Sequence, residues 1–232
     1  MATMPAILEE EHRDEAIGRA GAYFTRAGQS DAPFTGANFE TVGHRWDEPA
    51  QTNRITESDL LALSMLSVPA DGRAVQQVLS AEFQSEASAL LAEIPSHASI
   101  GTPNAFHMWL APGKTMHRLW HLVFHVHGLG VVSTSKLLAR KRADLVPVYD
   151  TMISTGWDLQ TNENSWEAMH ALLCKNEGAL LAVGEQIRGL AGIPRYVAPL
   201  RVLDAVVWHT GSKPNWNTGG SVVDTRDDER EP

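Results

Sequence analysis

The tight turn Gly128-Leu129-Gly130 constrains the fold of this chain more than any other feature. The segments on either side of it, 115–126 and 131–142, are both expected to be helical. Glycine reaches positive φ without a Cβ clash, so one helix can follow another after a very short turn. We therefore predict a helical hairpin in which Leu129 anchors the turn in the core.

Helical patterns recur along most of the chain. Thr56 and Asp59 have the spacing of a capping box, which predicts a helix start at that point. Pro199 is suited to the first position of the last helix, and Gly211 to its end. We expect helices at 16–24, 60–66, 73–93, 103–109, 115–126, 131–142, from Pro147 through Asp150, at 166–181 and 184–190 with a break near Val183-Gly184, and at 199–211. The prediction is an all-α domain of roughly eight helices.

Composition and length favour one globular protein of 232 residues, with 43% hydrophobic and 20% charged residues. We expect residues 1–55 to be a helix and a loop-rich segment packed on the core, 56–210 to form the helical domain, and 211–232 to be a disordered acidic tail. The N-terminus lacks a signal pattern and no apolar run reaches membrane-spanning length, so we expect a cytoplasmic protein. The single cysteine, Cys174, excludes an intrachain disulfide and an all-cysteine metal centre.

The charge distribution is uneven. The formal net charge is −9, yet no acidic residue lies between Glu93 and Asp144. That segment carries Lys114, Arg118, Lys136, Arg140, Lys141 and Arg142. A localised basic face on an acidic protein is typical of polyanion binding, which favours a nucleic acid as partner.

The hairpin indicates how a phosphate could be held. The first amides of the helix after the turn are unpaired, and they lie at the positive end of the helix dipole. Ser133, Thr134 and Ser135 add hydroxyl donors, and Lys136 and Arg140 add positive charge at i,i+4 spacing. We therefore predict DNA contacts from Gly128, Leu129, Gly130, Ser133, Thr134, Ser135, Lys136 and Arg140. A plain turn between helices without a ligand is the alternative interpretation.

With its aspartate, this region resembles the helix-hairpin-helix DNA glycosylases of the endonuclease III-like superfamily. The resemblance rests on Gly128-Leu129-Gly130-Val131-Val132, the following helix and Val148-Tyr149-Asp150, and covers about 117–156. It implies that Asp150 is the catalytic carboxylate. Most of the chain also resembles an uncharacterised bacterial family related to this superfamily, through 135–142, 53–56, Asp59-Leu60 and 200–204.

The chain departs from the superfamily in ways that narrow its chemistry. The position of the nucleophilic lysine of glycosylase–lyases is Val132, which excludes Schiff-base chemistry from that position. The four-cysteine cluster is absent, and Tyr149 stands where valine is usual. The resemblance thus implies a monofunctional glycosylase that flips a modified or damaged base out of DNA and hydrolyses its N-glycosidic bond, without a cofactor.

Two alternatives remain open at this point. Asp150 could be a helix-capping carboxylate in a non-catalytic hairpin module that binds nucleic acid. The second alternative is a helical protein whose basic stripe contacts an acidic protein partner. No motif names the base or the oligomeric state.

His117, His121 and His125 recur every fourth residue and share one stripe of a helix. Such pairs can bind zinc, but Arg118 lies between the first two and the glutamate of zinc proteases is missing, so we predict no metal site. Titration of the stripe is expected to strengthen nucleic-acid binding at low pH. Trp109 and Trp120 are candidates for stacking on a base, with core packing as the alternative.

Overall fold

The computed structural model describes residues 2–43, 51–159 and 165–212. Within these ranges the chain forms ten α-helices and no β-strand, which confirms the all-α prediction and its approximate number of helices. The helices are α1 (Arg13–Phe24), α2 (Glu57–Met65), α3 (Gly72–Val78), α4 (Ala81–Glu93), α5 (Thr115–Phe124), α6 (Val131–Lys141), α7 (Thr151–Gly156), α8 (Ser165–Leu173), α9 (Ala179–Leu190) and α10 (Pro199–Gly211). The disordered tail was expected over 211–232, and its residues from 213 onward lie outside the described part of the chain.

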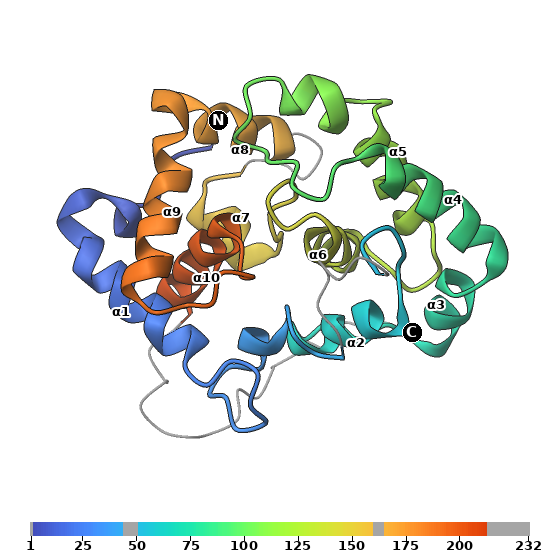
Figure 1. The fold of residues 1–232 in the computed structure, drawn as a ribbon, viewed down its shortest axis with the longest axis horizontal. Coiled ribbons are helices and arrows are strands. Elements are labelled where there is room, and N and C mark those ends of the chain that lie inside the picture. Colours follow the sequence, from blue (N-terminus) through green and yellow to red (C-terminus); the bar gives the residue numbers. More distant parts are fainter. Residues whose placement is uncertain (1, 44–50, 160–164, 213–232) are drawn as a thin grey trace, which may run out of the picture.

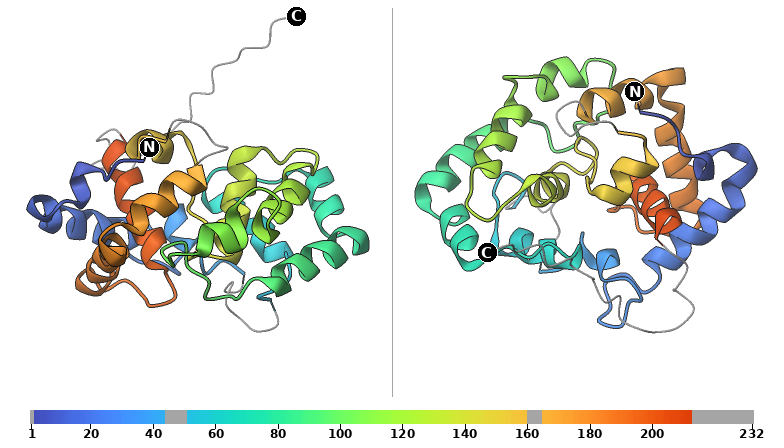
Figure 2. Two further views of the ribbon diagram at one scale, coloured as in Figure 1. Left: turned by 90° about the horizontal axis from the view of Figure 1, so that it is seen from above. Right: turned by 180° about the vertical axis from the view of Figure 1, so that it is seen from behind.

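Helix α6 lies near the centre of the molecule, with α3–α5 to one side and α1, α9 and α10 to the other (Figure 1). Helices α2 and α5 pack on α6, while α10 packs on α1, α7 and α9. The view from behind shows the same arrangement (Figure 2). One hydrophobic cluster contains residues from Ile7 to Val207, so the N-terminal segment shares the core of the helical region. The boundaries at residues 55 and 210 stay predictions.

Local sequence explains where several helices begin. Thr56 caps α2 in the predicted capping box, since its side chain accepts from the amide of Asp59 and the Asp59 carboxylate accepts from the amide of Thr56 at 2.9 Å. Asp71 caps α3 by accepting from the amide of Ala74 at 2.8 Å. Pro199 occupies the first turn of α10, as predicted.

The positions of two breaks between helices were predicted wrongly. The helix expected over 73–93 is broken, because the side chain of Ser80 accepts from the amide of Phe83 and starts α4 afresh. The break expected near Val183-Gly184 occurs earlier instead, at Gly178, whose φ is +82°. Gly184 lies within α9. None of the helices in the described ranges is long and apolar enough to cross a membrane.

Candidate functional site

The hairpin forms between α5 and α6 as predicted. Gly128 has φ +86°, a conformation in which a side chain would be strained. Leu129 is buried in the hydrophobic core. Gly130 is extended and immediately precedes α6. Leu129 therefore fixes the turn from inside, while the two exposed glycines leave backbone at the surface.

The N-terminus of α6 is open. Gly130 provides no side-chain cap, and a Cβ on Gly130 would meet no atom within 4 Å in the described part of the chain. The unpaired amides of the first turn can donate hydrogen bonds to an anion there. Asp71 restricts the approach, because its Oδ2 would lie 2.8 Å from a Cβ on Gly128. A phosphate is therefore better placed beside Gly130 than beside Gly128.

The three hydroxyl residues of α6 differ in exposure. Ser133 is half-buried, and Thr134 and Ser135 are buried. The Ser135 hydroxyl donates to the carbonyl oxygen of Pro147 at 3.1 Å, which fixes the chain leading to α7. Of the three predicted phosphate donors, only Ser133 reaches the surface in this fold.

The prediction of an exposed basic face on α6 is wrong. Lys136 is 5% exposed, and Arg140, Lys141 and Arg142 have no exposed surface. Burying an unpaired charge is very unfavourable, so such side chains must find partners inside the protein. Lys136 and Arg140 are therefore structural in this fold and are not available to a DNA phosphate.

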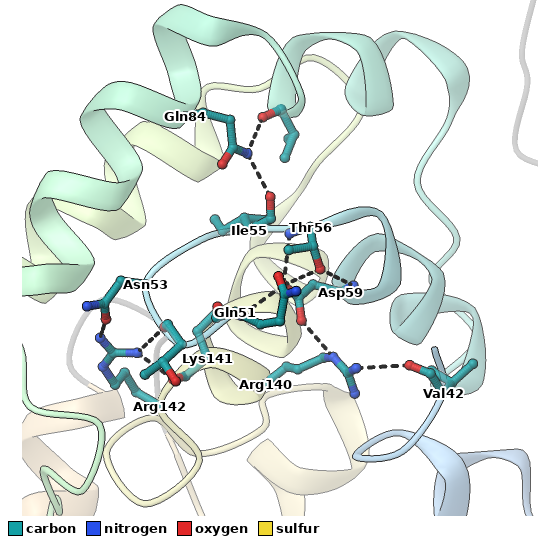
Figure 3. Close-up of polar contacts among 12 residues, drawn as sticks. Val42, Gln51, Asn53, Ile55, Thr56, Asp59, Gln84, Arg140, Lys141 and Arg142 are labelled. Carbon is teal, nitrogen blue, oxygen red and sulfur yellow. Dashed lines mark hydrogen bonds and ion pairs between the residues drawn. The ribbon is translucent and has the colours of Figure 1, made fainter. Parts of the chain in front are cut away.

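Asp59 is the partner of two of these cations (Figure 3). Its Oδ1 accepts from Arg140 Nε at 2.8 Å, and its Oδ2 accepts from Lys141 Nζ at 2.9 Å. Arg140 also donates to the carbonyl oxygens of Phe39 and Val42. Burial raises the pKa of Asp59, but Lys141 and Arg140 outweigh burial, so its pKa lies below the ordinary value.

Arg142 has no carboxylate partner in the described part of the chain and instead joins backbone segments (Figure 3). Its guanidinium donates to the carbonyl oxygens of Leu91, Ile94 and Thr52 and to the side chain of Asn53 at 2.8 Å. Burial lowers the pKa of Arg142 to about 10, so the group is charged at neutral pH. Arg142 thus ties the end of α6 to the segment that contains Thr52 and Asn53.

Asp150 lies at the N-cap of α7 rather than inside a helix opened by Pro147. Its Oδ1 accepts from the amide of Ile153 at 2.9 Å, and its Oδ2 lies 3.4 Å from Lys136 Nζ. Lys136 also donates to the carbonyl oxygen of Leu66 at 3.1 Å. Burial lowers the pKa of Lys136, and Asp150 opposes that effect. The Asp150 side chain is 18% exposed, so solvent reaches the carboxylate.

An open groove of about 440 Å³ lies beside α5. We call it the histidine groove, and it is lined by Gln77, Phe83, Glu86, His117, Arg118, His121, Leu122 and His125. The structure thus places all three predicted histidines along one surface. No group of three His, Cys, Asp or Glu side chains among the described residues has the geometry of a metal site.

The sequence interpretation missed a second buried polar group, which joins α10 to the N-terminal segment. Arg201 Nε donates to Glu40 at 3.1 Å, and Asp204 Oδ2 accepts from the amide of Val148 at 2.9 Å. Burial raises the pKa of Asp204 to about 7. Glu40, Arg140, Arg201 and Asp204 line a cavity of about 10 Å³, the size of one water.

Residues 16–211 match the model of the Family of unknown function (DUF6308), and the chain belongs to that family. No curated protein and no solved structure matches the chain.

Proposed function

We propose that this member of the DUF6308 family binds DNA through the hairpin between α5 and α6, and that Asp150 hydrolyses an N-glycosidic bond. The observation that carries the proposal is the position of Asp150, whose carboxylate lies 3.4 Å from Lys136 of α6. The helix that begins at the phosphate-binding turn thus also holds the acidic side chain. The resemblance to helix-hairpin-helix glycosylases supports the same assignment.

The proposed chemistry requires the target nucleotide to leave the base stack, which costs a few kcal/mol. The amides at Gly130 and the hydroxyl of Ser133 would hold the backbone phosphate beside that nucleotide. The C1′–N bond then breaks, the base leaves with the bonding electrons, and water adds to C1′ and loses a proton. Asp150 stabilises the oxocarbenium-like sugar or accepts that proton. Lys136 is a positioning residue that orients the carboxylate.

Binding at the hairpin is tested by Ser133→Glu, which places a negative charge beside the open N-terminus of α6. We expect the affinity for a duplex oligonucleotide, measured by fluorescence anisotropy, to fall by tenfold or more, roughly the value of one charge-assisted hydrogen bond. Ser30→Glu is the matched control, since Ser30 is exposed in the loop after α1. Equal affinities for the two variants would count against the hairpin.

Catalysis is tested by release of free base. Wild type and Asp150→Asn are incubated with alkylated, deaminated, oxidised and phage-type modified duplexes, and excised bases are identified by mass spectrometry. Release by the wild type alone, with DNA binding nearly intact in the variant, is expected for a monofunctional glycosylase. The identity of the released base would then name the substrate.

A second candidate function, a non-catalytic hairpin module that binds nucleic acid, is favoured by one observation. Both oxygens of Asp150 are already engaged, one by the Ile153 amide and one by Lys136. In that case Asp150 acts only as a helix cap. Wild type and Asp150→Asn would then both bind DNA, and neither would release a base from any duplex.

A further inference from the structure

The exposed basic side chains of the acid-free segment lie on α5 and its two capping residues rather than on α6. Lys114, Arg118, His121 and His125 are exposed, His117 is half-buried, and α5 itself contains no acidic residue. The groove beside them has an apolar floor at Phe83, which is buried. We propose that the histidine groove binds the phosphodiester backbone of the DNA strand that leaves the hairpin, and that the affinity for DNA rises as its histidines gain protons. This inference rests on the proposed DNA binding.

Hydrogen bonds fix which imidazole nitrogens face a ligand. His117 Nδ1 accepts from the amide of Gly113 at 3.3 Å, so the proton of the neutral ring is on Nε2. His125 Nδ1 lies 2.7 Å from the carbonyl oxygen of His121, which can only accept, so Nδ1 carries the proton. His117 can therefore donate from Nε2 when neutral, whereas His125 gains a second donor only when protonated.

The charged groups of the groove that surround the stripe offset one another. Glu86 of α4 lies in the groove together with Arg118, and Gln77 of α3 is uncharged. Burial lowers the pKa of His117, and His121 lowers it further. A bound phosphate would favour the protonated rings, so protons and DNA should bind together.

Other charges border the groove at its two ends. Glu93 accepts from the hydroxyl of Thr115 at 2.7 Å, at the start of α5. Near the hairpin, Asp71 interacts electrostatically with His127. These carboxylates limit the surface on which a polyanion can lie to the stretch between them.

The position of the groove favours DNA over a metal ion as occupant. The amide of His127 donates to Gln77 Oε1 at 3.2 Å, so the wall of the groove is tied directly to the hairpin. Arg118 adds a permanent charge that attracts phosphate and repels a cation.

The test measures the affinity of a duplex oligonucleotide at pH 8.0 and 5.5 over a range of salt concentrations, with a chelator present. For the wild type we expect binding at pH 5.5 to be tenfold or more tighter, roughly the value of one added charge-assisted hydrogen bond. The slope of log affinity against log salt should steepen from about −2, for Lys114 and Arg118, to roughly −4 with the histidines charged. His121→Gln/His125→Gln should lose most of the tightening between pH 8.0 and pH 5.5. His97→Gln, at an exposed histidine outside the groove, should behave as wild type.

Three results would overturn the inference, and they differ in what they say of the hairpin. If DNA affinity does not change with pH, or rises equally at low pH in the double variant, the groove is not a DNA-binding site. The proposed binding at the hairpin is unaffected by that result. If His97→Gln loses the rise in affinity at low pH as fully as the double variant does, the groove is not the cause of that rise. No binding by any of the proteins at either pH overturns both the groove and the proposed DNA binding.

Discussion

The buried carboxyl of Asp204 couples the stability of the protein to pH. Its Oδ2 accepts from the Val148 amide, while its Oδ1 has no hydrogen-bond partner among the described residues. Burial raises the pKa of this group to about 7 from 3.8. Between these two values the unfolded chain has lost a proton that the folded protein keeps. The stabilising effect of this proton is therefore complete below about pH 4 and is lost as the pH rises through 7.

Asp204→Asn should remove this dependence. The amide keeps an oxygen for the Val148 N–H but does not ionise. Relative to wild type, the free energy of unfolding of the variant should rise between pH 5 and pH 7 by up to ~1.4 kcal/mol per pH unit. Urea denaturation at a series of pH values measures the difference, with Asp14→Asn on the exposed side of α1 as control. A constant difference between Asp204→Asn and wild type would show that Asp204 is already ionised in the fold.

At the scale of elements, the packing of α9 against α10 depends on Gly184. A Cβ at this position would lie 2.7 Å from the carbonyl oxygen of Pro199 and 3.1 Å from Leu203 Cγ. Gly189, in the last turn of the same helix, has open space around it. Identical substitutions at the two glycines should therefore have opposite effects.

We expect Gly184→Ala to lower the free energy of unfolding by ~1–3 kcal/mol, because the two helices must move apart. Gly189→Ala should leave stability unchanged or raise it by up to ~1 kcal/mol through better helix propensity. Thermal unfolding followed by circular dichroism compares them. Equal melting temperatures would mean that α9 and α10 adjust without strain.

These elements also show what could be predicted from sequence. The capping box at Thr56, the hairpin and the start of α10 are local, and each was predicted correctly. Gly184 was misread as a helix break because its function, a close approach to Pro199, is tertiary. Ser80 was missed because the apolar spacing of Val75, Leu79 and Phe83 continues through it.

The cations of α6 were wrongly predicted to be exposed for the same reason, a tertiary contact, here with a residue far away in the sequence. Arg140 finds its carboxylate on Asp59, 81 residues earlier in the chain. A run of cations looks the same in sequence whether it faces solvent or a buried partner. The position of Asp150 beside Lys136 could likewise not be read from spacing, and Asp150 caps α7 instead of lying in a helix that opens at Pro147.

At the scale of the whole molecule, Asp59 connects the N-terminal segment, α2 and α6. It completes the capping box of α2 and pairs with Arg140 and Lys141, while Arg140 holds the carbonyl oxygens of Phe39 and Val42. All three charged side chains are without exposed surface. Removing this negative charge would break both ion pairs inside the protein, which is far less favourable than losing a surface pair.

Asp59→Asn, which keeps the shape and the capping ability of the side chain, should therefore destabilise the protein by ~3–5 kcal/mol. The control is Glu57→Gln in the same first turn of α2, where the side chain is exposed and the expected loss is below ~1 kcal/mol. Because the folded pKa of Asp59 is lowered, its contribution is present at neutral pH and is lost as the pH falls through that value. The gap between the variant and wild type in urea denaturation should accordingly narrow in acid. A gap as small as that of Glu57→Gln would mean that water or a shifted side chain compensates Arg140 and Lys141, and that the centre of the molecule is less dependent on this aspartate than its contacts imply.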